Sequence, residues 1–166
     1  MVERTVLVDK QEMHYEGIFS VKGLYELIDD LIRKSGYTKR ELKNTEIVKK
    51  DGRFIEVGIE PWKRLSDYAK SVIKIKMTLE NIKDLEIEKE GLRRSINQGK
   101  VSFVFDAYVE TDFEHKWENT PGFFFVRVLF DKYIFKPFTT DYQGMVMKDF
   151  KHYVNEIRAF LNLHKY

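Results

Sequence analysis

Hydrophobic positions recur along this chain with two periods, one of two residues and one of three to four, and these periods divide it into strands and helices. Residues 13–19 alternate and predict a first strand. Apolar residues then recur three and four apart over 21–32, which predicts an amphipathic helix of about four turns. Ser20 is placed to cap its N-terminus and Gly36 to end it. The segment 38–42, TKREL, predicts one more short helical turn.

The middle of the chain has the pattern of antiparallel strands, each with one polar face. An Asp51-Gly52 pair separates the first two alternating runs, and this pair is typical of a type I′ hairpin turn, which needs positive φ at both central residues. Segment 91–99, GLRRSINQG, is interpreted as a connection between strands. The alternating runs are 45–50, 53–60, 73–79 and 84–88.

The last third of the chain holds the two most apolar runs and a long helical pattern. VSFVFDAYVE (101–110) and GFFFVRVLF (122–130) predict strands, and 141–163 predicts a long amphipathic helix. The order of elements predicts one α+β domain over 1–166, with a curved antiparallel sheet of about six to seven strands packed on the C-terminal helix. A shorter helix follows the first strand. The apolar stripe of the last helix comprises Met147, Phe150, Val154, Ile157 and Leu161.

Three segments carry a resemblance to a known family. A strand runs into a helix (MHYEGIFS into VKGLYELIDDLIRKSG), a meander of strands follows, and a long helix ends the chain (DYQGMVMKDFKHYVNEIRAFLNLH). This order resembles the helix-grip proteins, the family of START lipid-transfer domains, birch-pollen-allergen-type proteins and polyketide cyclases. The resemblance implies an apolar ligand held between the sheet and the last helix, and in some members an enzyme. The glycine-rich loop of the pollen-allergen group has no counterpart here, because the corresponding hairpin, KKDGRF, has one glycine.

Composition narrows the function classes. The 166 residues include no cysteine, which excludes disulfides, a thiol nucleophile and thiolate metal sites. Because no apolar stretch has the length of a signal peptide or of a membrane span, which needs roughly 20 residues, we expect a cytoplasmic protein without a membrane span. Abundant Lys and Glu without Cys is a thermophile-like composition that mesophilic proteins share.

Charge is nearly balanced overall but uneven locally. The formal net charge is +2, yet residues 33–50 hold seven basic against two acidic side chains. Residues 106–118 hold five acidic side chains against one basic. Each run is typical of a solvated surface, and each is also suited to steer an oppositely charged partner.

Sequence motifs of catalysis are absent. The chain contains no GxxxxGK[ST], no GxGxxG after a strand, no HExxH and no GxSxG. His115 has acidic neighbours in Asp112 and Glu114, but this segment is interpreted as an acidic hairpin loop. We therefore expect no metal, no cofactor and no catalytic residue, and we favour binding over catalysis.

Aromatic residues are in excess, with 13 Phe, 9 Tyr and 2 Trp. If Phe124 and Phe130 face the last helix, Phe123 and Phe125 face outward beside Arg127. Three arrangements then compete: a homodimer through that face, an internal cavity lined by aromatics, or cover by residues 131–140.

Three functional hypotheses follow. The first is a non-catalytic protein that holds an apolar small molecule or lipid between the sheet and the last helix. The second is an interaction or assembly module, homo-oligomeric through Phe123, Phe125 and Arg127. The third, which the balanced charge makes the weakest, is nucleic-acid binding through 33–50. The residues expected to line the ligand site of the first hypothesis are Phe103, Phe105, Trp117, Phe124, Phe130 and Tyr153.

Overall fold

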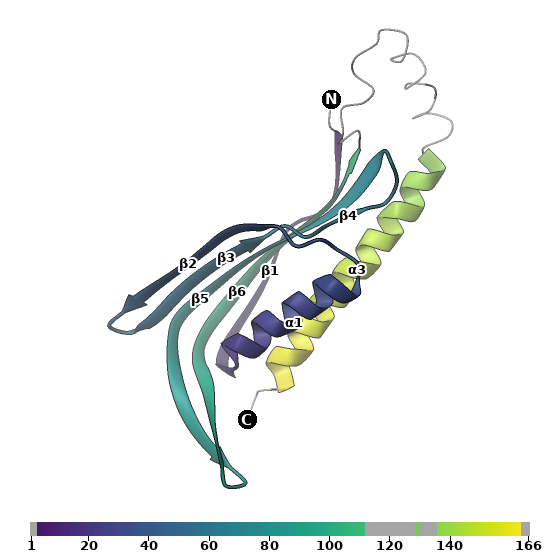
Figure 1. Cartoon of the computed structure of the whole chain (residues 1–166). Helices are drawn as coiled ribbons and strands as arrows, with labels where there is room; N and C mark the ends of the chain where they lie inside the picture. Colours follow the sequence, from purple (N-terminus) through teal and green to yellow (C-terminus); the bar gives the residue numbers. More distant parts are fainter. Residues whose placement is uncertain (1–2, 112–128, 130–135, 164–166) are drawn as a thin grey trace.

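Six strands and two helices make up the described part of the chain, residues 3–111, 129 and 136–163 of a computed structural model (Figure 1). In chain order the elements are β1 (Glu3–Phe19), α1 (Val21–Lys34), β2 (Glu41–Lys49), β3 (Gly52–Ile59), β4 (Trp62–Arg64), β5 (Ala69–Lys89), β6 (Leu92–Thr111) and α3 (Lys136–Leu163).

The strands form one antiparallel sheet in the order β1-β6-β5-β3-β2, and β4 pairs with β5 beyond the end of β3. The first strand, β1, therefore pairs with β6, the last described strand, and β1 and β2 are the edges of a sheet that is not closed. Both helices lie on the same side of the curved sheet, its inner face (Figure 1). The α+β prediction is confirmed with six described strands, a helix after the first strand and a second helix at the C-terminus. This second helix begins at Lys136 rather than near Asp141.

The core lies between the inner face and the two helices. Alternation in β5 and β6 puts every second side chain on this face, and the apolar stripes of α1 and α3 pack against them. These buried side chains are the main source of stability, because burial of each large one contributes roughly 1.5–3 kcal/mol. The central members are Leu24, Ile28, Ile73, Ile75, Met77, Leu79, Val101, Phe103, Phe105, Phe150, Tyr153 and Ile157.

Both predicted ends of α1 are confirmed. The Gly23 N–H donates to Ser20 Oγ at 2.9 Å, which caps the N-terminus. At the C-terminus Gly36 has a φ of +75°, and the Tyr37 N–H donates to the Ile32 carbonyl at 3.0 Å. This is a Schellman motif, whose left-handed position glycine occupies without strain.

The helical turn predicted over 38–42 is wrong. Thr38 instead forms an antiparallel bridge with Trp62, with N–H to O distances of 2.7 and 3.0 Å, and β2 begins at Glu41. Backbone groups that a helical turn would have paired locally are paired here with a distant strand. The tertiary partner therefore overrides the local preference.

The two hairpin turns differ from their prediction. In the β2–β3 hairpin Lys49 pairs with Gly52, so the loop is Lys50-Asp51, and neither of these has positive φ. A Cβ on Gly52 would lie 2.8 Å from the backbone of Asn81. Glycine is therefore needed here because β3 and β5 approach each other too closely for a side chain. The type I′ conformation occurs instead between β5 and β6, where Glu90 and Gly91 have φ of 56° and 75°.

Segment 91–99 is therefore strand from Leu92 onward and not a connection. It pairs with β5 from Lys89↔Leu92 to Lys83↔Gln98. Its sequence hides this because Leu92 and Ile96 are its only large apolar residues, too few to show a period of two. A bulge between Glu80 and Lys83 separates this end from the rest of β5, and the hairpin bends there (Figure 1).

Candidate functional site

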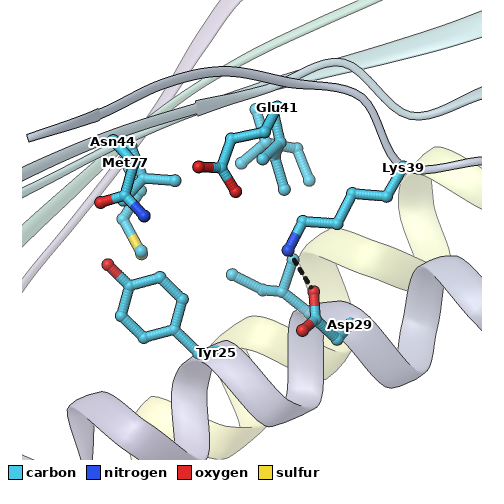
Figure 2. A pocket seen from close by; sticks show the side chains of 10 residues that line it. Tyr25, Asp29, Lys39, Glu41, Asn44 and Met77 are labelled. Atoms are coloured by element: carbon cyan, nitrogen blue, oxygen red, sulfur yellow. Dashed lines mark hydrogen bonds and ion pairs between the residues drawn. The ribbon is translucent and has the colours of Figure 1, made fainter.

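A hollow lies between α1 and the inner face of the sheet, at the side formed by β2, β3 and β5 (Figure 2). Its volume is about 80 Å³. The floor is apolar because the alternating inward positions of β3 and β5 meet one residue of α1 there. The floor residues are Ile28, Val57, Ile59, Ile75 and Met77, all buried.

The rim of the hollow is polar. Tyr25 and Asp29 are four residues apart on α1 and so share a side of the helix. Lys39 comes from the link after α1, and Glu41 and Asn44 come from β2, opposite Ile59 and Val57. Figure 2 shows the Tyr25 ring, the Glu41 carboxylate and the Asn44 amide around the opening.

Only part of this rim is internally paired. Lys39 Nζ donates to Asp29 Oδ1 at 2.8 Å and ties the link to the helix. Within the described residues, the Tyr25 hydroxyl, the Glu41 carboxylate and the Asn44 amide form no hydrogen bond or ion pair. Three polar groups are therefore free to meet a ligand above an apolar floor.

The electrostatics of the rim are acidic. Burial raises the pKa of Tyr25, and the nearby carboxylates of Glu46 and Glu41 raise it further. The phenol is therefore protonated at neutral pH and can donate a hydrogen bond. The same carboxylates favour a positive charge beside it.

A wider open groove of about 590 Å³ continues from the hollow along α1 and shares Tyr25, Asp29 and Asn44 with it. Its charges are largely paired. Arg53 contacts Asp84 at 2.6 Å and Glu46 at 3.3 Å. This part of the surface is a polar approach to the hollow.

The structure places three of the residues predicted to line a ligand site in the packed core. Phe103, Phe105 and Tyr153 are completely buried. The Phe103 and Phe105 rings stack at 5.5 Å, and Phe105 meets Phe150 edge-on at 5.8 Å. None of the three lines the hollow against α1. The other three residues predicted for the ligand site, Trp117, Phe124 and Phe130, lie outside the described residues. So do the three predicted for the interface, Phe123, Phe125 and Arg127.

A buried hydroxyl network joins α3 to α1 and β5. Ser71 Oγ donates to the Tyr37 hydroxyl at 2.9 Å, and the latter donates to Asp149 at 3.1 Å. The Tyr153 hydroxyl shares a hydrogen bond of 2.7 Å with Ser35 Oγ. Burial raises the pKa of Tyr37 strongly and that of Tyr153 to about 12. Both hydroxyls are hydrogen-bonded within the protein, and both side chains are buried. Tyr37 and Tyr153 therefore hold α3 against α1 and β5 and do not face a substrate.

The basic run 33–50 is partly neutralised by the fold. Lys39 pairs with Asp29, Arg40 with Glu60 at 3.7 Å, and Lys43 with Glu56 at 2.9 Å. These carboxylates weaken the positive field that the sequence alone suggested for a nucleic acid.

Among the described residues, no group of three His, Asp or Glu side chains is arranged to hold a metal ion. In the same part of the chain, neither helix is long and apolar enough to cross a bilayer.

Comparison with known proteins found no matching family model, no matching curated protein and no matching solved structure.

Proposed function

We propose that this protein is a non-catalytic binding protein for a small amphiphilic molecule, held between α1 and the inner face of the sheet. The apolar body of this ligand follows the apolar small molecule or lipid expected from the sequence, and its polar end is added by the rim. The site differs, because the hollow against α1 offers an opening, whereas Phe103, Phe105 and Tyr153 are packed in the core.

The observation that carries the proposal is an apolar floor beneath unpaired polar groups. Ligand sites combine mostly apolar walls with a few placed polar groups that orient the ligand. Here Met77 and Ile75 belong to the floor, and Tyr25, Glu41 and Asn44 supply the polar groups. The remaining core places its apolar side chains against each other.

The chemistry of the rim selects the polar end of the ligand. Glu41 offers a carboxylate, Tyr25 a hydroxyl and Asn44 an amide oxygen, all of which accept hydrogen bonds. Since the Glu41 carboxylate has no paired cation among the described residues, an ammonium group is favoured and a carboxylate is repelled. We therefore propose a small amine with an apolar body.

The volume of the hollow limits the apolar body. Sites that enclose a whole drug-sized ligand usually have volumes of about 300–1,000 Å³. A hollow of about 80 Å³ therefore holds a short alkyl chain or the edge of one ring, and a larger ligand extends into the open groove.

Three aromatic probes of similar size and different charge test this proposal. The full chain, labelled with ¹⁵N, is titrated with benzylammonium, benzyl alcohol and benzoate while its amide resonances are followed. We expect saturable shifts at Tyr25, Asp29 and Asn44, strongest with benzylammonium and weakest with benzoate. No saturable shift at this rim with any probe would overturn the site, and equal binding of benzoate would overturn the preference for an amine.

A matched pair of variants assigns the charge. Glu41→Gln removes the rim carboxylate and should weaken benzylammonium binding about fivefold, the effect of one exposed ion pair. Glu12→Gln makes the same change at an exposed position on the other face of the sheet, opposite Val104, and should leave binding unchanged. Equal effects of both variants would contradict the role of Glu41.

A further inference from the structure

The far end of the β5–β6 hairpin, residues 83–98, has two chemically different faces. Cross-strand register places Leu85 opposite Ile96, Ile87 opposite Arg94, and Lys89 opposite Leu92. Opposite residues of an antiparallel pair point to the same side, and alternate residues share it. One side, the basic–apolar face, therefore carries Lys83, Leu85, Ile87, Lys89, Leu92, Arg94, Ile96 and Gln98.

The other side of the same hairpin is acidic. It carries Asp84, Glu86 and Glu88 with Arg93, and Asp84 is held by Arg53 in the open groove. The two strands thus separate aliphatic and basic residues from acidic ones. This separation is a property of the register and is not visible in the net charge.

The basic–apolar face is exposed. Leu92 is 60% exposed, and Leu85, Ile87 and Ile96 are partly exposed. The hairpin projects beyond the two helices, so neither helix covers its end (Figure 1). Four aliphatic side chains bordered by Lys83, Lys89 and Arg94 form a surface suited to a partner that is both apolar and anionic.

We propose that this face docks onto an anionic phospholipid bilayer. Leu92 and Ile87 would enter the boundary between headgroups and acyl chains, while the basic side chains would lie among the phosphates. Lys and Arg also fit this position because their aliphatic stems lie along apolar surface while the charge stays in water.

Two other occupants fit less well. A second copy of the same face would bring Lys83, Lys89 and Arg94 against their equivalents, and like charges oppose that contact. A nucleic acid would match the charge, but the face offers aliphatic side chains where base stacking needs aromatic or planar ones. The bilayer proposal is independent of the ligand proposed for the hollow.

Vesicle co-sedimentation of the full chain tests the proposal. Vesicles of phosphatidylcholine alone are compared with vesicles containing about 30% phosphatidylserine, the anionic lipid of the cytoplasmic leaflet. We expect binding only to the anionic vesicles and a loss of binding at high salt. Equal binding to both, or no binding to either, would overturn the proposal.

Two variants of the same kind locate the contact. Leu92→Glu should weaken binding to the anionic vesicles by about tenfold or more, because it puts an acid into the inserted surface. Val48→Glu makes a comparable change at a 78% exposed residue of β2 and should bind as the wild type does. Thermal unfolding checks that both variants fold.

The rival occupants give distinct results. A dimer in sedimentation velocity that Leu92→Glu converts to monomer would assign the face to a second copy and overturn the bilayer. A second rival result is a DNA or RNA oligonucleotide that competes with the vesicles and loses its binding in Leu92→Glu. That result would assign the face to a nucleic acid and overturn the bilayer. An unaffected Leu92→Glu variant would exclude this face altogether.

Discussion

At the scale of single residues, two buried tyrosines show how polar groups enter the core of this fold. Tyr37 and Tyr153 lie edge to face at 6.0 Å, and each hydroxyl is hydrogen-bonded to a serine. A phenol without a partner at this depth would cost roughly 1–3 kcal/mol. The hydrogen bonds remove that cost and tie α3 to the end of α1.

The raised pKa of Tyr153 predicts a loss of stability at alkaline pH. The ordinary value is 10.0 and the folded value is about 12, so the unfolded chain releases this proton first. The stabilisation is complete below pH 10 and decreases as the pH rises from 10 toward 12. Denaturant unfolding at a series of pH values should show a smaller alkaline loss in Tyr153→Phe than in the wild type. Identical pH profiles would contradict this assignment.

At the scale of elements, the long β5–β6 hairpin depends on a turn whose sequence is not optimal. Glu90 adopts a φ of 56° beside Gly91, and glutamate carries a Cβ that disfavours this region. A type I′ turn prefers Asn-Gly, because asparagine tolerates positive φ. The pairing of Lys89 with Leu92 and the long register behind it hold the turn in place.

Replacement of Glu90 by asparagine should therefore stabilise the protein by about 0.5–1 kcal/mol. Denaturant unfolding at neutral pH measures the difference. Glu88→Asn removes the same charge on the neighbouring strand and should be neutral or slightly destabilising, since asparagine is depleted in strands. A gain in Glu88→Asn equal to that in Glu90→Asn would assign the effect to charge and not to the turn.

At the scale of the whole molecule, burial is concentrated along the middle of the sheet. The inward side chains of β5 up to Glu80, and those of the part of β6 that pairs with it, are covered by α1 and α3. In contrast, β2 is an edge strand with no fully buried residue. The hairpin end beyond Glu80 has few buried side chains. The candidate hollow lies at the side of this covered region, under α1, whereas the proposed docking face lies on the hairpin end beyond both helices.

This distribution predicts a gradient of local stability. Backbone amides exchange by local opening, which is rare where apolar contacts are dense. Hydrogen exchange should therefore be slowest over 73–79 and 101–109 and faster over 41–49 and 84–97. Measurement by mass spectrometry of peptic fragments checks this order. Equal protection of 84–97 and 101–109 would show that the hairpin end is covered in solution.

Local signals predicted the elements whose causes are local. Ser20 and Gly36 mark the ends of α1 because capping involves residues three or four apart. The Asp51-Gly52 pair correctly indicated a hairpin but not its register, because Gly52 is required by its distance to Asn81 on another strand. The candidate site was missed for the same reason. Nothing near Glu41 or Asn44 in the sequence distinguishes them from other polar strand residues.

The sequence by itself determined the class of the fold, the places of the two helices and most of the strands that the structure describes, and the apolar faces that form the core. These follow from the period of hydrophobic side chains, which acts within a few residues. Only the tertiary structure decided that Phe103, Phe105 and Tyr153 are packed core, that Tyr25 and Glu41 meet above an apolar floor, and that 92–98 pairs with 83–89. The physical reason is that these arrangements depend on strand register and helix docking, which bring together residues far apart in the chain.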